Sequence, residues 1–284
     1  MKILVTGASG LLGSILVPVL RTSGYEVFGH SNSKSGWINA DLTIKDDAKA
    51  LMEKIQPNLI INLVALTNVD ICEKDPLRAH QLNSEVVENI VEAMGDSSQN
   101  FLIHISTDQV YDSPGYSIED DIQLKNTYAL SKYAGELAAS KVPSTIFRTN
   151  FYGKSPIETR LSFSDWILDS LRKNIPITVF DDVIFNPLTF DTLIAMILLA
   201  IERRIDGVFN LGSRGAISKA DFAFTLAKVY GLASASLSSG SIQNAGLLAF
   251  RPRDMSMDCT RFESAFNVRL PTILDEISNL NRNL

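Results

Sequence analysis

Short apolar runs alternate with segments of helical periodicity through the first half of the chain. Residues 59–64 are almost all apolar, which is typical of a strand buried on both faces of a parallel sheet. Further strands are predicted at residues 2–6, 26–30, 101–106 and 145–148. Helices are predicted at residues 10–22, 45–55, 76–94 and 128–141. Strands and helices that alternate in this way predict an α/β fold of Rossmann type, with a doubly wound parallel sheet.

The pattern becomes less regular after residue 153. Helices are predicted there at residues 163–173, 190–203 and 219–230, and strands at residues 177–180 and 208–211. Residues 233–246 are rich in Ser, Ala and Gly, and we interpret them as a loop. We therefore expect a dinucleotide-binding domain at residues 1–152. Residues 153–284 would form a smaller, mainly substrate-binding C-terminal lobe, with some segments returning to the first domain.

Composition narrows the class of protein. Of 284 residues, 45% are hydrophobic and 20% are charged, as in globular proteins with a sizeable core. The net charge of −6 argues against a nucleic-acid partner. The two cysteines have neither metal-site nor disulfide spacing, so we expect buried thiols and no metal site. We see no signal peptide, and the longest apolar stretch, residues 193–201, is too short to span a bilayer. We therefore expect a cytoplasmic protein without a membrane partner.

A glycine-rich turn follows the first predicted strand. Gly7, Gly10 and Gly13 have the spacing G-x-x-G-x-x-G and stand where this strand passes into a helix. Glycine permits the tight turn and lets backbone N–H groups approach a pyrophosphate, whose charge the helix N-terminus favours. The pattern predicts a dinucleotide site, to which the same turn would contribute Ser9, Leu11 and Leu12.

The end of the second predicted strand bears on the choice between NAD and NADP. An acidic residue at this place would bind the ribose 2′-hydroxyl. Residues 29–34 contain no carboxylate, and Ser31, Asn32 and Lys34 can hold a 2′-phosphate instead. We therefore expect NADPH as the cofactor, with NADH as the alternative.

Tyr128 and Lys132 are four residues apart and therefore share one face of a predicted helix. The pKa of free tyrosine is about 10. A lysine ammonium one turn away stabilises the phenolate, so the tyrosine can protonate a carbonyl oxygen near neutral pH. Thr107 follows a predicted buried strand, at the edge where open α/β sheets bind ligands. Its hydroxyl can position the same oxygen, and Ser106 is the alternative.

Five motifs occur in the order typical of one superfamily. They are TGASGLLG at residues 6–13, INLVALTNVD at 61–70, HISTDQVYD at 104–112, YALSK at 128–132 and RPRDMSMD at 251–258. In these motifs the chain resembles the extended short-chain dehydrogenase/reductase superfamily, and more closely the dTDP-4-dehydrorhamnose reductases. The likeness extends over essentially the whole chain.

This resemblance implies roles for residues at matching positions. Tyr128 would be the general acid, Lys132 its activator and a ligand of the cofactor ribose, and Thr107 a ligand of the carbonyl. The adenine would be contacted by Asp41 and Leu42. The ribose and nicotinamide would be lined by Val64, Ala65 and Leu66. The substrate would be contacted by Thr67, Asp108, Gln109, Phe151 and Arg251.

Within the substrate contacts, Arg251 would lie near the diphosphate, whose geometry a guanidinium suits. Three positions depart from the family pattern. Gln109 stands where an aromatic residue is usual, Phe151 lies near the place of a tryptophan, and Leu66 replaces a tyrosine. These departures leave hydride transfer intact and leave the identity of the sugar open.

The resemblance implies NADPH-dependent reduction of a nucleotide-linked 4-keto-deoxysugar by a homodimer, as in the biosynthesis of dTDP-rhamnose and cell-surface polysaccharide. Two alternatives stay open. One is a non-catalytic NADP-binding regulatory subunit that resembles that of methionine adenosyltransferase. The other is a nucleotide-sugar epimerase or dehydratase that retains its NAD. Net oxidation of the cofactor by a keto-sugar distinguishes the reductase from both.

Overall fold

The computed structural model describes residues 1–32, 34–95 and 100–280. The chain folds into two compact units that interleave along the sequence. Unit 1 comprises Met1–Thr107, Asn126–Arg148 and Ile194–Phe209. Unit 2 comprises Asp108–Lys125, Thr149–Leu193 and Asn210–Leu284. Residues 281–284 of the predicted C-terminal lobe lie outside the described residues.

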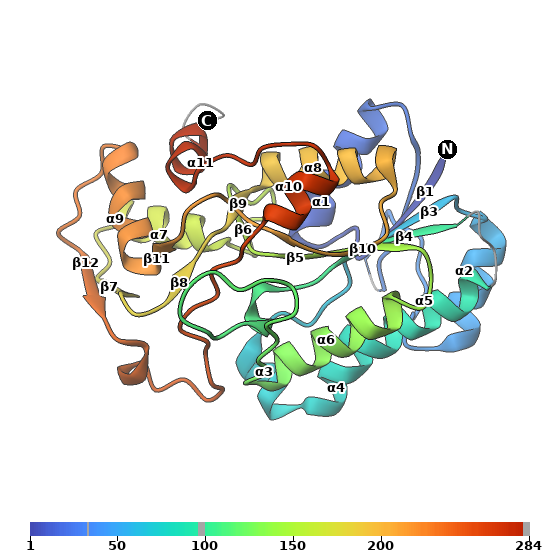
Figure 1. Ribbon diagram of the computed structural model, residues 1–284, viewed down its shortest axis with the longest axis horizontal. Helices are drawn as coiled ribbons and strands as arrows, with labels where there is room; N and C mark the ends of the chain where they lie inside the picture. The colour runs from blue at the N-terminus through green and yellow to red at the C-terminus, as the bar shows by residue number, and fades with distance from the viewer. Residues whose placement is uncertain (33, 96–99, 281–284) are drawn as a thin grey trace. The chain divides into compact units, whose positions relative to one another are not determined.

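A six-stranded sheet forms the centre of unit 1 (Figure 1). Its strands are β1 (Lys2–Thr6), β2 (Glu26–Gly29), β3 (Leu59–Asn62), β4 (Phe101–Ile105), β5 (Ser144–Thr149) and β10 (Gly207–Leu211). Their order is β10-β5-β4-β3-β1-β2, and the pairs from β5 to β2 are parallel. The strand order reverses at β1, which has β2 on one side and β3 on the other. Sheets of this kind bind ligands beyond the carboxyl ends of the strands at such a switch point.

Helices cover both faces of this sheet. They are α1 (Leu11–Thr22), α2 (Lys45–Ile55), α3 (Val69–Lys74), α4 (Pro76–His80), α5 (Val86–Met94), α6 (Thr127–Ala139) and α8 (Phe190–Arg203). A buried cluster joins α2, α5 and α6 to one face, where Leu51, Ile90 and Ala138 pack on Ile60 and Leu102 of the strands. Figure 1 shows α1 and α8 on the opposite side of the sheet. Each fully buried aliphatic side chain of this kind contributes about 1.5–3 kcal/mol.

The helix predicted at residues 76–94 is interrupted. It consists of α4, a π-helical turn (Gln81–Glu85) and α5. Pro76 occupies the first turn, directly after the N-cap Asp75. The wider turn adds one residue locally, and the side chain of Asn83 within it bonds to groups outside the helix. The 3.6-residue pattern does not reveal this turn, because the apolar periodicity resumes directly after it.

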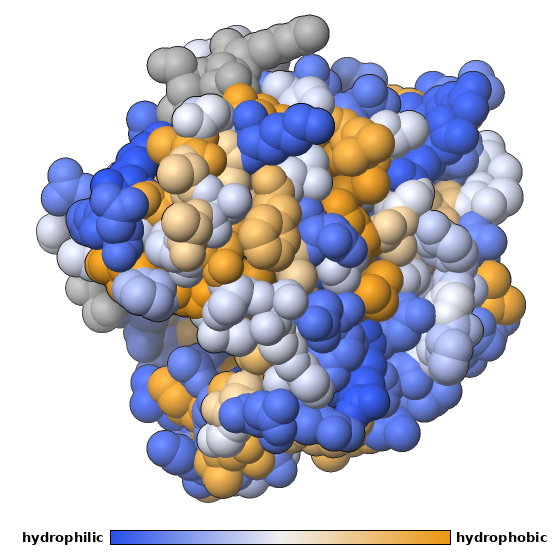
Figure 2. Space-filling model, turned by 90° about the vertical axis from the view of Figure 1, so that its left-hand side faces the viewer, coloured by the Kyte–Doolittle hydropathy of each residue, from blue (hydrophilic) through white to orange (hydrophobic). Residues whose placement is uncertain are grey.

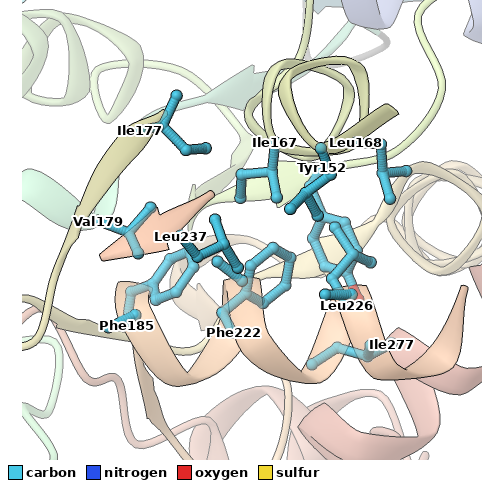
Figure 3. Close-up of a cluster of buried hydrophobic side chains, with 14 of the residues drawn as sticks. Tyr152, Ile167, Leu168, Ile177, Val179, Phe185, Phe222, Leu226, Leu237 and Ile277 are labelled. Atoms are coloured by element: carbon cyan, nitrogen blue, oxygen red, sulfur yellow. The ribbon is translucent and has the colours of Figure 1, made fainter. Parts of the chain in front are cut away.

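Unit 2 consists of short strands and helices around a core of its own. They are η2 (Asp108–Val110), β6 (Phe151–Tyr152), α7 (Phe163–Arg172), β7 (Ile177–Phe180), β8 (Ile184–Phe185), β9 (Leu188–Thr189), β11 (Ile217–Ser218), α9 (Lys219–Val229), β12 (Leu237–Gly240), η3 (Ile242–Asn244), α10 (Thr260–Ala265) and α11 (Ile273–Leu280). Figure 3 shows this core around Phe222 of α9. The ring of Phe222 stacks on Phe163 at 5.7 Å and meets Tyr152 edge to face at 4.8 Å between centroids. These aromatic contacts fix α9 against α7 and β6.

The loop predicted at residues 233–246 contains two regular elements, so this prediction is wrong. The strand β12 pairs in parallel with β7, with Leu237 opposite Ile177, and η3 follows it. The Leu-Ser-Ser-Gly sequence of β12 has little strand preference of its own. Pairing with a segment some 60 residues away therefore decides its conformation, as Thr178 and Ser238 show with hydroxyl oxygens 3.0 Å apart.

Figure 2 views the side on which α7, α9 and β12 lie, where hydrophobic residues are mixed with hydrophilic ones. Within the described ranges, every helix is too short or too polar to cross a membrane. Cys72 and Cys259 are buried thiols, as predicted.

Candidate active site

The glycine turn joins β1 to α1 and has the close packing that only glycine permits. Gly7 has φ of 72°, in the left-handed region, and a Cβ there would lie 2.9 Å from the backbone of Leu63 and Val64. A Cβ on Gly13 would lie 2.7 Å from backbone atoms of Ala8. Gly10 is the N-cap of α1, and its N–H donates to the carbonyl of Gly7 at 2.9 Å. Backbone N–H groups at this helix start can therefore be approached closely by an anion.

The glycine turn is bonded to the end of β2. The N–H of Ala8 donates to the carbonyl of His30 at 2.9 Å, and the hydroxyls of Ser9 and Ser31 lie 2.8 Å apart. The backbone N–H of Lys34 donates to the Ser31 hydroxyl at 3.4 Å. The Ser31 side chain is thus buried and engaged within the protein, whereas Asn32 and Lys34 are exposed.

A cavity of about 340 Å³ lies in unit 1 beside the predicted adenine contact. It is lined by Asn32, Asp41, Thr43, Asp75, Leu77, Arg78, Gln81 and Leu82. Among these described lining residues Arg78 supplies the positive charge, and sequence reasoning missed it because its helix is distant from β2 in sequence. Neither Ser31 nor Lys34 lines the cavity. The Leu42 side chain is buried in the core, so only its backbone can face a ligand.

The segment after β3, which contains Val64, Ala65 and Leu66, is held by two asparagines. The Oδ1 of Asn62 accepts from Thr6 Oγ1 at 2.6 Å and from the Val64 N–H at 3.3 Å. The Oδ1 of Asn83, in the π turn, accepts from the Leu66 N–H at 2.7 Å. Its Nδ2 donates to the Leu66 carbonyl at 3.2 Å and to the Ser131 hydroxyl at 2.9 Å. Asn83 therefore links the predicted ribose-lining segment to α6. Thr67, which follows, is exposed.

Helix α6 presents Tyr128 and Lys132, both buried, one turn apart as predicted. Asn126 caps the helix by accepting from the Ala129 N–H at 2.7 Å. Lys132 Nζ donates to the carbonyl of Ile105, the last residue of β4, at 2.7 Å. Burial lowers the pKa of Lys132 to about 8, although the carboxylate of Glu136 acts to raise it. Most of the Lys132 population is therefore still an ammonium at neutral pH.

Ser106 and Thr107 follow β4, and their surroundings differ. The Ser106 hydroxyl donates a short hydrogen bond to Glu136 Oε1, and its N–H donates to the carbonyl of Phe147 at 2.7 Å. Glu136 forms a buried ion pair with Arg148 at 2.6 Å. The Ser106 hydroxyl is thus directed into the protein, which favours Thr107 over Ser106 as the ligand of a carbonyl.

The remaining predicted substrate residues lie in unit 2. Asp108 is buried at the start of η2, where its Oδ2 accepts from Asn150 Nδ2 at 2.8 Å. Gln109 is half-buried beside it. Phe151 begins β6, with its ring 5.5 Å from that of Phe190. Arg251 is half-buried, and its Nη1 donates to the carbonyl of Ala249 at 3.0 Å.

Sequence reasoning missed a second cation in unit 2. Lys219, at the start of α9, has its Nζ 5.5 Å from the ring centroid of Phe163 and 5.9 Å from that of Phe185. Burial lowers the pKa of Lys219, while the charge of Asp108 acts to raise it and that of Arg251 to lower it further. Two cations and a carboxylate from three separate segments therefore share one electrostatic environment. Only folding brings them together, so no local motif could have marked Lys219.

Comparison with known proteins supplies a family. Residues 1–283 match the family model described as the RmlD substrate binding domain. A probable low-salt glycan biosynthesis reductase, Agl14, of Haloferax volcanii is 28% identical over 97% of this chain and 96% of that protein. A dTDP-4-dehydrorhamnose reductase of Aggregatibacter actinomycetemcomitans is 30% identical over 94% of each chain. Methionine adenosyltransferase 2 subunit beta of Danio rerio is 23% identical over 92% of this chain and 84% of that protein.

Among solved structures, the fold is shared with the dTDP-4-dehydrorhamnose reductase of Bacillus anthracis, crystallised in complex with NADP. The TM-score is 0.90 over 100% of this chain and 99% of that chain, at 24% identity. This likeness confirms the predicted α/β fold with a doubly wound parallel sheet.

Proposed function

Because the chain belongs to the RmlD substrate-binding domain family, we propose that it is an NADPH-dependent reductase of a nucleotide-linked 4-keto-deoxysugar. The observation that carries this proposal is the buried pair Tyr128 and Lys132, one turn apart on α6, with Lys132 bonded to the carbonyl of Ile105. Thr107 lies two residues beyond that carbonyl. A proton donor, a cation and a hydroxyl thus lie at the carboxyl edge of the parallel sheet, where ligands of such folds bind.

The residues of unit 1 fit a dinucleotide. Gly7 and Gly13 leave no room for a Cβ against the backbone of Leu63, Val64 and Ala8, so the turn and the helix pack closely. The backbone N–H groups at the start of α1 would bind the pyrophosphate. Asp41 and the Leu42 backbone would contact the adenine, and the segment held by Asn62 and Asn83 would line the ribose and nicotinamide. When bound, NADPH supplies the hydride.

In the proposed reaction the protein handles the proton and the carbonyl oxygen. Thr107 donates a hydrogen bond to this oxygen, and Tyr128 transfers its phenolic proton to it as negative charge develops. The ammonium of Lys132 stabilises the phenolate that remains. Because these groups are buried, their electrostatic interactions are stronger than they would be in water.

For the cofactor we propose NADPH over NADH, since the end of β2 carries no carboxylate. The 2′-phosphate would be held by Asn32 and by Arg78, whose guanidinium suits a phosphate and which lines the cavity beside Asp41. This assignment replaces Lys34 with Arg78 as the main cation.

For the substrate we propose a keto-sugar on a nucleoside diphosphate, with dTDP-4-dehydrorhamnose as the first compound to test. The name of the Aggregatibacter relative supports this choice. Arg251 and Lys219 would share the charge of the diphosphate, and Gln109 and Phe151 would contact the sugar. We further propose that unit 1 binds the dinucleotide and that unit 2, to which Gln109 and Phe151 belong, binds mainly the substrate, in a cytoplasmic homodimer.

The test is the loss of NADPH absorbance with purified protein and dTDP-4-dehydrorhamnose, with NADH and other nucleotide keto-sugars in parallel. We expect oxidation of NADPH, and Tyr128→Phe should lower turnover at least about a hundredfold with little change in cofactor affinity. Tyr133→Phe on the same helix is the matched control and should retain turnover. Unchanged turnover in Tyr128→Phe would remove this tyrosine from the mechanism.

A second candidate function is that of a regulatory subunit, favoured by the likeness to methionine adenosyltransferase 2 subunit beta. Such a protein would bind NADPH without oxidising it. If the whole panel of keto-sugars leaves a bound cofactor reduced, this second candidate replaces the reductase.

A further inference from the structure

One turn after Lys132 on α6 lies a buried ion pair that the proposed reaction does not itself use. Arg148 of β5 approaches Glu136 of α6 with Nη2 2.6 Å from Oε2, and its Nε lies 3.0 and 3.1 Å from the two carboxylate oxygens. The side chains are 4% and 2% exposed. An ion pair this deep is costly to desolvate and persists only where geometry and further hydrogen bonds compensate.

Glu136 and Lys132 hold two consecutive residues at the end of β4. Lys132 Nζ binds the carbonyl of Ile105 at 2.7 Å, and Glu136 accepts from the hydroxyl of Ser106. The two side chains are four positions apart and therefore lie on one face of α6. Thr107 is the next residue, so the contacts that hold Ile105 and Ser106 also fix the position of the Thr107 backbone.

The charged and titratable groups around Lys132 come from three elements. Glu136 and Tyr128 lie on α6, Arg148 on β5 and His104 on β4. Burial and the charge of Lys132 hold the pKa of His104 well below its usual range, so this imidazole is neutral. Glu136 is the carboxylate whose charge acts in favour of the Lys132 ammonium.

We infer that Glu136 is a positioning residue for the proposed reaction: it keeps Lys132 protonated and, through Ser106, fixes the turn that presents Thr107. Arg148 holds the carboxylate in place. The inference rests on the proposed function only for its catalytic meaning, because the effect on Lys132 is a property of the protein alone.

The physical argument is a balance between burial and charge. Burial favours the neutral amine of Lys132 and brings its pKa to about 8 even with the carboxylate nearby. Removing the negative charge leaves burial less opposed, so Lys132 loses its proton at lower pH. The cation that stabilises the Tyr128 phenolate is then depleted within the working pH range.

The experiment is an NMR titration of protein labelled with ¹³C at the lysine ε-carbons, with the Lys132 signal assigned by its absence in Lys132→Met. In Glu136→Gln the side chain keeps its shape and an acceptor oxygen for Ser106 but loses the charge. We expect the titration midpoint of Lys132 to fall by at least about one pH unit. Glu92→Gln, which removes a carboxylate from the exposed ion pair with Lys45, is the matched control and should leave it unchanged.

An unchanged or raised midpoint in Glu136→Gln overturns the inference. If this variant fails to fold, Glu136→Gln combined with Arg148→Gln removes both charges without leaving one unpaired. Because Arg148 also acts on Lys132, the double variant is compared with Arg148→Gln: a lower Lys132 midpoint in the double variant supports the inference, and an equal one overturns it.

Activity separates this inference from the proposed function. If NADPH is oxidised, the fall of kcat at high pH should occur at lower pH in Glu136→Gln, and the shift should equal that of the Lys132 midpoint. A lowered midpoint in a protein that reduces no keto-sugar upholds the effect of Glu136 on Lys132 and contradicts the proposed function. If the protein reduces a keto-sugar but the Lys132 midpoint does not move in Glu136→Gln, the proposed function is upheld and the effect of Glu136 on Lys132 is contradicted.

Discussion

At the scale of the residue, we predict that Arg251 and Lys219 of unit 2 contribute to substrate binding. Arg251→Ala should raise the KM for the nucleotide sugar about tenfold or more and leave that for NADPH nearly unchanged, because a charge-assisted hydrogen bond is worth about 1.5–3 kcal/mol. Lys219→Met, which keeps an apolar chain against Phe163, should act in the same direction. Steady-state kinetics with each ligand varied in turn measure both effects.

The control for this pair is Arg253→Ala, which removes an exposed guanidinium two residues further on. It should change neither KM by more than a small factor. Equal increases in both constants for Arg251→Ala would point to a role in the fold rather than in diphosphate binding.

A second prediction at this scale concerns cofactor choice. Arg78→Ala should lower the ratio of kcat/KM for NADPH to that for NADH about tenfold, because the guanidinium would meet only the 2′-phosphate. Lys34→Ala, which removes an exposed lysine outside the cavity, should leave the ratio unchanged. The reverse outcome would restore Lys34, as the sequence alone suggested, and exclude Arg78.

At the scale of the element, the close contact between α6 and the π turn depends on a glycine, Gly135. A Cβ on Gly135 would lie 2.2 Å from the carbonyl oxygen of Asn83. Gly135→Ala should therefore displace the π turn and lower the free energy of unfolding by about 1–3 kcal/mol, despite the better helix propensity of alanine. Urea denaturation measures the change.

The matched control is Leu137→Ala, at an exposed position of the same helix. It should shift the free energy of unfolding by no more than about 0.5 kcal/mol. If Gly135→Ala proves as mild as this control, the helix and the π turn can separate without cost, and Asn83 is not fixed by α6.

At the scale of the whole molecule, the two thiols report on opening of the structure. Burial raises the pKa of Cys259 to about 12, and Cys72 is fully buried. The thiolate is the reactive species, so a colorimetric thiol reagent should react with neither cysteine of the native protein at pH 8. In denaturant both thiols should react, and in denatured Cys72→Ala one thiol should react. Rapid labelling of the native protein would show that one of the units opens locally.

The alternating pattern of the first half predicted most of the central sheet and the helices around it. It succeeded because a parallel strand buried on both faces must be apolar and a covering helix must carry an apolar stripe. The family and the oxidoreductase class inferred from five short motifs are confirmed by the family model and the relatives. The strand β12 and the π turn escaped prediction, because a distant partner strand decides the first and a side-chain network accompanies the second.

What the sequence by itself determined is local: the glycine turn, and Tyr128 one turn before Lys132. In each case the spacing along one element sets the geometry. What only the tertiary structure decided is which distant groups act on them. Asn83, Arg78 and Lys219 carry no motif, and the hydrogen bond that directs Ser106 into the protein goes to Glu136, a residue from another element. Such contacts are made across the chain by packing, and no sequence period encodes them.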